Sequence, residues 1–322
     1  MKLWAGVLVV LLLGCGGGGG NAGDVPPGPA VSVQESQCLA AGWQRLVIDA
    51  AGLQRAVLWK APPNGWSRGA LVVMHGGGGQ HANFCVANSP VIAAQVQFTT
   101  LALAQGFAVF LPDSSDRVTD NEGRLCGKVW DDEVRARANL DLPFLEHLLA
   151  VSMPALRPAG SRAEVFLAGH SSGGYMAVRA ATKLADRVKA FAPVASGDPY
   201  GWFRDCTPRA SDRVNVFGAG FDSETRRQII ESGACNSATY PQEKPWDGAA
   251  LAARPAWRAF HHAEDGINDV SCVEKVGNQL RVRGYPETPA FRLTGGARSA
   301  DAHAWADAYN QPLLDFFSAQ LR

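Results

Sequence analysis

The segment 169–173 reads Gly-His-Ser-Ser-Gly and matches the pattern G-x-S-x-G. An apolar run at 163–168 precedes it and a helical pattern at 174–184 follows it, which is the strand–turn–helix context that the motif needs. Small residues two positions before and after the serine permit a sharp, strained turn that projects the hydroxyl at the carboxyl end of a strand. We therefore expect Ser171 to be a nucleophile, with a glycine-rich turn without chemistry as the alternative.

A run of glycines, 76–79, follows His75 directly. Glycines bring their backbone N–H groups close to a substrate, where such donors stabilise the oxyanion of a tetrahedral intermediate. We assign this role to the amides of Gly77 and Ser172, with Gly76 as the rival of Gly77, and expect His75 to orient the loop. A phosphate-binding loop would continue into Gly-Lys-Ser or Gly-Lys-Thr, and this loop does not.

A serine hydroxyl is a weak nucleophile until a base removes its proton. In folds built around this motif the acid and then the histidine follow the serine in the chain. His303 follows the last apolar run, 289–293, and directly precedes the terminal helical pattern, so it is the expected base. The chain order excludes the histidines that come before the serine, which are His75, His81, His147 and His170.

The acid is expected after the penultimate strand. Asp265 follows the apolar run 256–260, where its carboxylate would orient His303 and stabilise the imidazolium form. Asp269 is the main rival and Asp222 a more distant one. Asp113 follows the run 107–111, and we expect it to be structural or to contact the substrate.

Apolar runs alternate with helical patterns along most of the chain, which predicts parallel strands with crossover connections in an α/β fold. We expect strands at 45–49, 55–59, 70–74, 107–111, 163–168, 190–195, 256–260 and 289–293. We expect helices at 91–105, 130–151, 174–184, 272–283 and 304–321.

The segment 198–255 departs from this alternation, and we interpret it as a cap or lid insertion. It contains aromatic residues that belong to the core of such a lid or, in an alternative interpretation, to a face that binds a polymer. Those residues are Tyr200, Trp202, Phe203, Tyr240 and Trp246.

The amino-terminal end predicts export. Lys2 and the apolar run 3–13 have the charge and length of a signal peptide, and the run is too short for a transmembrane helix. The run ends in Leu-Leu-Gly-Cys and resembles a bacterial lipobox, so residues 1–14 would be removed and Cys15 lipidated. An ordinary signal peptide with a chance cysteine is the alternative. Residues 15–36 are then a Gly/Pro-rich tether, and 37–322 the catalytic domain.

Six further cysteines suit an exported chain with disulfides: Cys38, Cys85, Cys126, Cys206, Cys235 and Cys272. We predict the pairs Cys85–Cys126 and Cys206–Cys235 because each pair brackets one loop-rich segment. No C-x-x-C pair or Cys/His cluster is present, so we predict no metal site.

The charge balance excludes one class of function. The chain has 322 residues, with 30 basic and 30 acidic side chains and no run of lysine or arginine. A nucleic-acid-binding face needs a basic patch, so we predict no nucleic-acid partner.

Three segments carry a resemblance to a known family: 71–80 (Leu-Val-Val-Met-His-Gly-Gly-Gly-Gly-Gln), 102–113 (Ala-Leu-Ala-Gln-Gly-Phe-Ala-Val-Phe-Leu-Pro-Asp) and 169–177 (Gly-His-Ser-Ser-Gly-Gly-Tyr-Met-Ala). They resemble the exported polyhydroxybutyrate depolymerase-like esterases, which are related to bacterial feruloyl and acetyl xylan esterases. The resemblance implies the α/β-hydrolase fold, hydrolysis of carboxylic esters and a triad at Ser171, Asp265 and His303. Where the family's acid segment has Gly and Val, this chain has His262 and Asn268.

We therefore predict a serine esterase without a cofactor, acting on a polyester, feruloyl or acetyl ester through an acyl-enzyme. Its partners would be an ester substrate, which is a polymer if the enzyme acts on a polyester, and a membrane to which the lipid at Cys15 anchors it. Its place would be the bacterial cell envelope, facing the periplasm or the exterior. The alternatives are a serine peptidase of the same fold and a non-catalytic polymer-binding lipoprotein.

Overall fold

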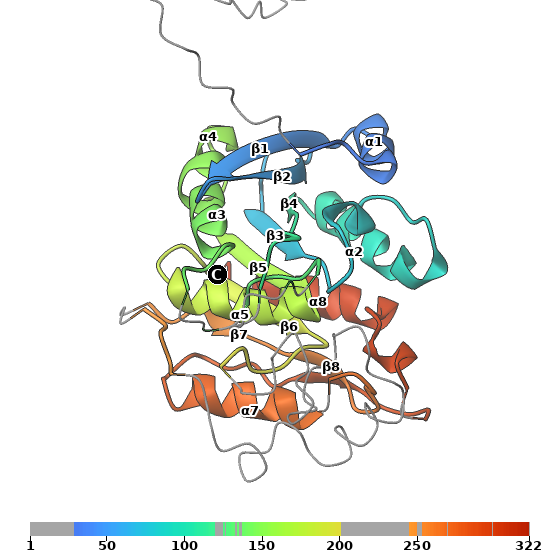
Figure 1. The fold of residues 1–322 in the computed structure, drawn as a ribbon, viewed down its shortest axis with the longest axis vertical. Helices are drawn as coiled ribbons and strands as arrows, with labels where there is room; N and C mark the ends of the chain where they lie inside the picture. The colour runs from blue at the N-terminus through green and yellow to red at the C-terminus, as the bar shows by residue number, and fades with distance from the viewer. Residues whose placement is uncertain are drawn as a thin grey trace, which may run out of the picture.

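The computed structural model describes residues 29–119, 125, 127–132, 134, 137–200, 245–249, 253–268, 270–297 and 299–321. In these residues the strands form one nine-stranded sheet with the order β1-β2-β4-β3-β5-β6-β8-β9, in which β7 also pairs with β6 (Figure 1). The strands are β1 (Gln44–Ala50), β2 (Leu53–Lys60), β3 (Ala70–Met74), β4 (Ala108–Pro112), β5 (Val165–His170), β6 (Ala190–Val194), β7 (Ala256–Trp257), β8 (Phe260–His262) and β9 (Phe291–Leu293).

Within this sheet β2 runs opposite to the other strands. β1 and β2 form an antiparallel hairpin, and β2 is antiparallel to β4, whereas all pairs from β4 to β9 are parallel. The hairpin turns at Ala51 and Gly52, which have φ angles of 53° and 73°. Parallel strands end at one common edge, so the loops after β3, β4, β5, β8 and β9 meet there.

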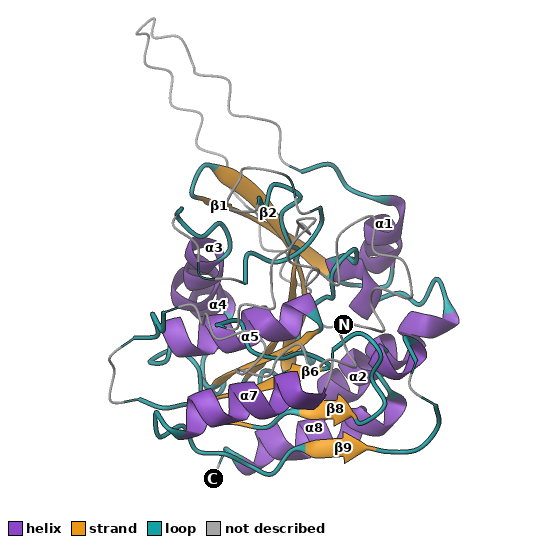
Figure 2. Cartoon of the chain, turned by 60° about the horizontal axis from the view of Figure 1, so that its bottom comes forward, coloured by secondary structure: helices purple, strands orange, loops and turns teal. Residues whose placement is uncertain are grey.

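Helices cover both faces of the sheet. One layer contains α3 (Leu142–His147), α4 (Met153–Leu156), α5 (Ser172–Lys183) and α7 (Val270–Arg281). The other contains α1 (Val33–Ala40), α2 (Ala93–Ala104) and α8 (Asp307–Ala319). Figure 2 shows β8 and β9 side by side near α7 and α8.

Burial on both faces of the sheet explains why the sequence of β3 is a continuous apolar run. All its side chains are buried, and they alternate between the two layers. Val72 and Met74 pack in the cluster of α3, α5 and α7, whereas Leu71 and Val73 pack in the cluster of α2 and α8. A strand covered on both faces needs apolar side chains at every position.

The helix predicted at 130–151 starts later than expected. Where residues 130–141 are described they form a loop, and α3 begins at Leu142. Polar side chains occupy the backbone groups that a helix would use: Asn139 accepts hydrogen bonds from the amides of Asp141 and Leu142, and Asp131 accepts one from Leu140. Such local bonds compete with helix formation.

The strand predicted at 256–260 is two short strands. β7 and β8 both pair with β6 and are separated by Arg258 and Ala259. The amide of Arg258 donates to Phe191 of β6, and the amide of Phe291 donates to Ala259, so the interruption is itself held by its neighbours. The apolar run predicted the position of these strands but not the break.

The amino-terminal boundary and one disulfide differ from the predictions. The predicted tether, 15–36, overlaps α1, which begins at Val33 with Ser32 as its N-cap. Cys85 pairs with Cys38 of α1, and not with Cys126. α1 lies against the short helix η1 (His81–Phe84), where Gln34 also donates to Ala82 and Val86.

Several predictions lie outside the described residues. They are the signal peptide, Cys15, most of the tether, the cysteines Cys126, Cys206 and Cys235, and the greater part of the insertion 198–255. Within the described residues no helix combines the length and the apolar character needed to cross a bilayer.

Candidate active site

Ser171 lies at the strained turn between β5 and α5. Its φ of 52° and ψ of −120° place it in a backbone region that residues with a side chain rarely adopt. Two contacts hold it there: its N–H donates to Val194 of β6 at 2.9 Å, and its carbonyl accepts from Gly174 at 2.8 Å. The first turn of α5 thus starts directly at the serine, with the amide of Ser172 at its amino-terminal end.

The glycines of the motif are required by contact. A Cβ on Gly169 would lie 2.1 Å from the carbonyl oxygen of Gly173. A Cβ on Gly173 would lie 2.4 Å from that of Met74 at the end of β3. The packing of β3, β5 and α5 therefore leaves no space for a side chain at either position.

Asp265 and His303 are in direct contact. Asp265 Oδ2 lies 2.8 Å from His303 Nδ1, and Asp265 Oδ1 accepts from the amides of Ile267 and Asn268 at 2.7 and 2.9 Å. Asp265 is fully buried, whereas the side chain of His303 is 13% exposed. Burial opposes the charged form, but the hydrogen bond from His303, its charge and that of His261, and the amide of Asn268 lower the pKa of Asp265.

His303 lies beside the nucleophile turn. His170, which directly precedes Ser171, donates from Nε2 to the carbonyl of His303 at 2.8 Å, and the two rings are 5.1 Å apart. Burial, and then the charge of His303, lowers the pKa of His170 to about 4. His170 is therefore neutral near pH 7 and acts here as a hydrogen-bond donor that joins the two loops.

Asn268 is fully buried and bonded at three groups. Its amide donates to Asp265, its Nδ2 donates to Ala195 at 2.7 Å, and its Oδ1 accepts from the hydroxyl of Tyr175 at 3.0 Å. It thereby connects the acid loop, the end of β6 and the first turn of α5. Sequence reasoning treated Asn268 only as a departure from a family pattern.

The glycine loop lies against the serine. A Cβ on Gly76 would lie 3.5 Å from the Cβ of Ser171. The amides of Gly78 and Gly79 are occupied, because they donate to Lys128 and Gly76. Among the described residues the amides of Gly76 and Gly77 have no backbone acceptor, which leaves both as candidate oxyanion donors.

His75 orients this loop. Its Nδ1 donates to the carbonyl of Gly76 at 2.8 Å, and its Nε2 accepts from the amide of Ser114 at 3.0 Å. Both ring nitrogens are thus engaged, and the side chain is buried. The ring is held in place between β3 and the end of β4 and is not aimed at Ser171 as a base.

The segment 127–132 supports both the glycine loop and the serine turn. Trp130 donates from Nε1 to the carbonyl of His75 at 2.8 Å, and its amide donates to Ser172 Oγ at 3.0 Å. Ser172 Oγ in turn donates to Asp132. Sequence reasoning assigned Trp130 to a helix and missed this role, for which the sequence carries no motif.

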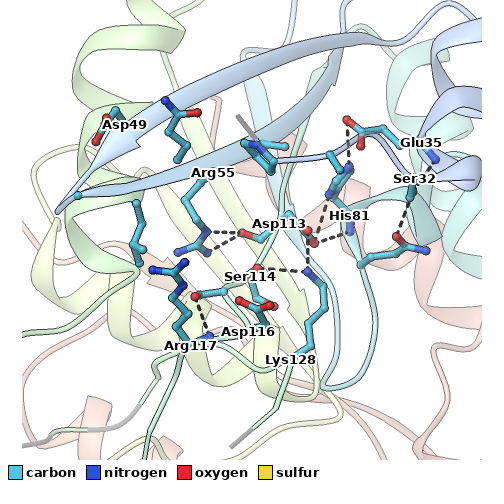
Figure 3. A pocket seen from close by; sticks show the side chains of 18 residues that line it. Ser32, Glu35, Asp49, Arg55, His81, Asp113, Ser114, Asp116, Arg117 and Lys128 are labelled. Atoms are coloured by element: carbon cyan, nitrogen blue, oxygen red, sulfur yellow. Dashed lines mark hydrogen bonds and ion pairs between the residues drawn. The ribbon is translucent and has the colours of Figure 1, made fainter. Parts of the chain in front are cut away.

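Asp113 contacts His75, His81 and Lys128, and Figure 3 shows its contacts with His81 and Lys128. Burial opposes its charge, but His75 and His81 hold the pKa of Asp113 well below its ordinary value. Burial likewise opposes charge on His81, but Asp113 and Glu35 raise its pKa. Asp113, His81, Glu35 and Lys128 border a cavity of about 700 Å³.

Asp269 and Asp222, the rivals for the acid, lie outside the described residues. In the part of the chain that the structure describes, no three His, Cys, Asp or Glu side chains are grouped as metal ligands would be.

Comparison with known proteins gives a fold. No protein-family model matches the sequence, and no curated protein matches it closely enough to count as a relative. Solved structures do match. The acetyl xylan esterase from Aspergillus awamori shares 16% identity with a TM-score of 0.53, covering 85% of this chain and 98% of that one. An S-formylglutathione hydrolase from Agrobacterium tumefaciens shares 14% identity with a TM-score of 0.53, covering 87% and 95%.

This chain has the α/β-hydrolase fold. The prediction of fold class is confirmed. At these identities the likeness extends to the fold alone, so the chemistry has to be argued from the side chains.

Proposed function

We propose that the protein is a serine esterase with Ser171 as nucleophile, His303 as general base and Asp265 as the acid that orients His303. The observation that carries this proposal is the 2.8 Å contact between Asp265 and His303, on a loop whose carbonyl is bonded to the residue preceding Ser171. A buried carboxylate on Nδ1 directs Nε2 outward as the proton acceptor.

The reaction follows from these positions. Ser171 Oγ attacks the ester carbonyl carbon while His303 Nε2 takes its proton, and Asp265 stabilises the imidazolium. His303 then returns the proton to the leaving alcohol, which leaves an acyl-serine. Water hydrolyses this ester by the same steps, with His303 first as base and then as acid.

The oxyanion donors would be the amides of Ser172 and Gly77, with Gly76 in place of Gly77 as the rival. Ser172 supports its assignment because its amide is in the first turn of α5, where backbone N–H groups lack partners within the helix. The amides of Gly76 and Gly77, which have no backbone acceptor among the described residues, support the second donor equally. Removing one such donor costs about 10²–10³ in rate.

The test is hydrolysis of a panel: short p-nitrophenyl esters, feruloyl esters, a polyester film and aminoacyl substrates. We expect the wild type to cleave esters, and Ser171→Ala to lower kcat by about 10⁶. The panel also tests the finer proposal of a polyester, feruloyl or acetyl ester substrate. Unchanged ester hydrolysis in Ser171→Ala would refute the nucleophile, and cleavage of aminoacyl substrates alone would favour a peptidase.

We further propose export to the cell envelope with a lipid anchor at Cys15. The lipobox-like sequence supports the anchor, and the Cys38–Cys85 disulfide supports an oxidising compartment. Mass spectrometry of the mature amino terminus tests it: a diacylated Cys15 is the expected result. An unmodified terminus elsewhere would indicate an ordinary signal peptide.

A further inference from the structure

We propose that Asp113 is a positioning residue that clamps the glycine loop at both ends and at its middle. The inference rests on the proposed function, because it assigns a role to Asp113 in shaping the oxyanion site. Asp113 follows β4, whereas the glycine loop follows β3, and the two strands are parallel neighbours in the sheet. The pairing of these two strands therefore places the Asp113 carboxylate next to the glycine loop.

The first end of the loop is held through His75. The amide of Ser114, the residue after Asp113, donates to His75 Nε2 at 3.0 Å, so the backbone next to Asp113 holds this ring; Asp113 Oδ1 lies 3.1 Å from the same nitrogen as a neighbour. The other ring nitrogen donates to Gly76. The end of β4 therefore fixes the ring that fixes the first glycine carbonyl.

The second end is held through His81. Its backbone amide donates to Asp113 Oδ1 at 3.1 Å, and its Nδ1 lies 3.2 Å from the same oxygen (Figure 3). One carboxylate oxygen thus contacts the residue before the glycines and the second residue after them. The span of the loop is set by Asp113 and its neighbour together, because Oδ1 accepts from His81 at the second end and the Ser114 amide holds His75 at the first.

The middle is held through Lys128. Its Nζ donates to Asp113 Oδ2 at 2.7 Å, while its backbone carbonyl accepts the amide of Gly78 at 2.7 Å. Because the amide of Gly78 is taken by this carbonyl, the loop presents the amides of Gly76 and Gly77 instead. A displaced Lys128 would free Gly78 and change which N–H groups face the substrate.

The chain allows a graded test. Asp113→Ala removes both oxygens. Asp113→Asn keeps one oxygen that can accept from the His81 amide. Lys128 then faces either an N–H group or an oxygen without charge. Lys128→Met removes only Nζ and keeps the carbonyl that holds Gly78. The matched control is Asp247→Asn, because Asp247 also holds a lysine and an arginine, Lys183 and Arg179, but on the far end of α5.

We expect kcat to fall by about 10²-fold in Asp113→Ala, the scale of losing one oxyanion donor, and by about tenfold in Asp113→Asn and Lys128→Met. KM should change little, and Asp247→Asn should retain the wild-type kcat. Thermal unfolding of each variant checks that it is folded at the assay temperature. A wild-type kcat in folded Asp113→Asn and Lys128→Met would overturn the proposal.

Hydrogen exchange gives a readout that does not need catalysis. The hydrogen-bonded amides of Gly78 and Gly79 should exchange about tenfold faster in Asp113→Asn than in the wild type, and should be unchanged in Asp247→Asn. Unchanged exchange across the loop in Asp113→Asn would refute the clamp even if the wild type is an active esterase. An inactive wild type with faster exchange in the variant would instead refute the proposed function and keep the clamp.

Discussion

Two carboxylate–histidine clusters lie at the same edge of the sheet in the part of the chain that the structure describes, and their histidines differ in which ring nitrogens are already bonded. Asp265 uses one oxygen for two backbone amides and the other for His303, whose ring is partly exposed. Asp113 lies against His75 and His81 with Oδ1 and against Lys128 with Oδ2. Both ring nitrogens of His75 are occupied by the protein.

The difference shows that residue type does not determine role. A histidine can transfer a proton only if one nitrogen faces the reacting group. His303 has its Nδ1 fixed by a carboxylate and its carbonyl bonded to the residue before Ser171, and we propose that its Nε2 takes the serine proton. His75 has no nitrogen left, so its carboxylate neighbour shapes the backbone of the glycine loop instead.

The largest expected effect is a difference in kcat when the same change, aspartate to asparagine, is made in each cluster. Asp265→Asn should lower kcat by about 10⁴, because the amide no longer holds His303 in the tautomer that accepts the serine proton. Asp113→Asn should lower it by only about tenfold. Steady-state kinetics on a p-nitrophenyl ester measure both, and equal losses in the two variants would remove the distinction.

The second effect concerns the disulfide on the Asp113 side. Cys38–Cys85 closes a separation of 47 residues and joins α1 to η1, the helix that follows the glycine loop. Replacing both cysteines by alanine should lower the free energy of unfolding by about 4 kcal/mol. Urea unfolding of oxidised wild type and the double variant checks this, and coincident midpoints would show that the bond adds no stability.

The third effect concerns the Asp265 side. Asn268→Val leaves the hydroxyl of Tyr175 and the carbonyl of Ala195 buried without partners, so it should lower the free energy of unfolding by about 2–3 kcal/mol. The control is Thr182→Val, which removes a bond to the hydroxyl of Tyr200 at the other end of α5. We expect both variants to lose stability, but only Asn268→Val to lose kcat.

The smallest effect is on pH dependence. Asp113 and Glu35 raise the pKa of His81 above its ordinary value of 6.5, against the effect of burial. The stability that this charge adds is therefore complete below pH 6.5 and is lost as the pH rises through the raised value. His81→Gln should cost more stability at pH 6 than at pH 9 in urea unfolding. A cost that grows with pH would show that His81 is folded as the neutral form.

The site was largely accessible from the sequence because its parts follow strands. Ser171, Asp265 and His303 each come after a strand in the parallel part of the sheet, so the parallel strands alone predict that they meet at one edge. The need for glycines in the turn could also be predicted, because the packing of β3 against α5 leaves no space for a side chain there. In such cases local pattern and global position carry the same information.

What the sequence did not predict depends on contacts between distant segments. Cys126 is 41 residues from Cys85, whereas Cys38 is 47 residues from it. Cys85 nevertheless pairs with Cys38, because α1 packs on η1. Trp130 lies in a helical pattern, but its indole is bonded to His75 and its amide to Ser172. Asn268 breaks a family pattern, and only the structure shows three partners for it. No local periodicity encodes such partners.

The central claim is that the hydroxyl at 171 is made reactive by the histidine at 303. The direct measurement is the rate of labelling by a fluorophosphonate, with the modified peptide identified by mass spectrometry. The account predicts one adduct, on Ser171, formed at least about 10³-fold more slowly in His303→Ala and in Asp265→Ala with the protein still folded. An adduct on another residue, or an undiminished rate on Ser171 in folded His303→Ala, would contradict it.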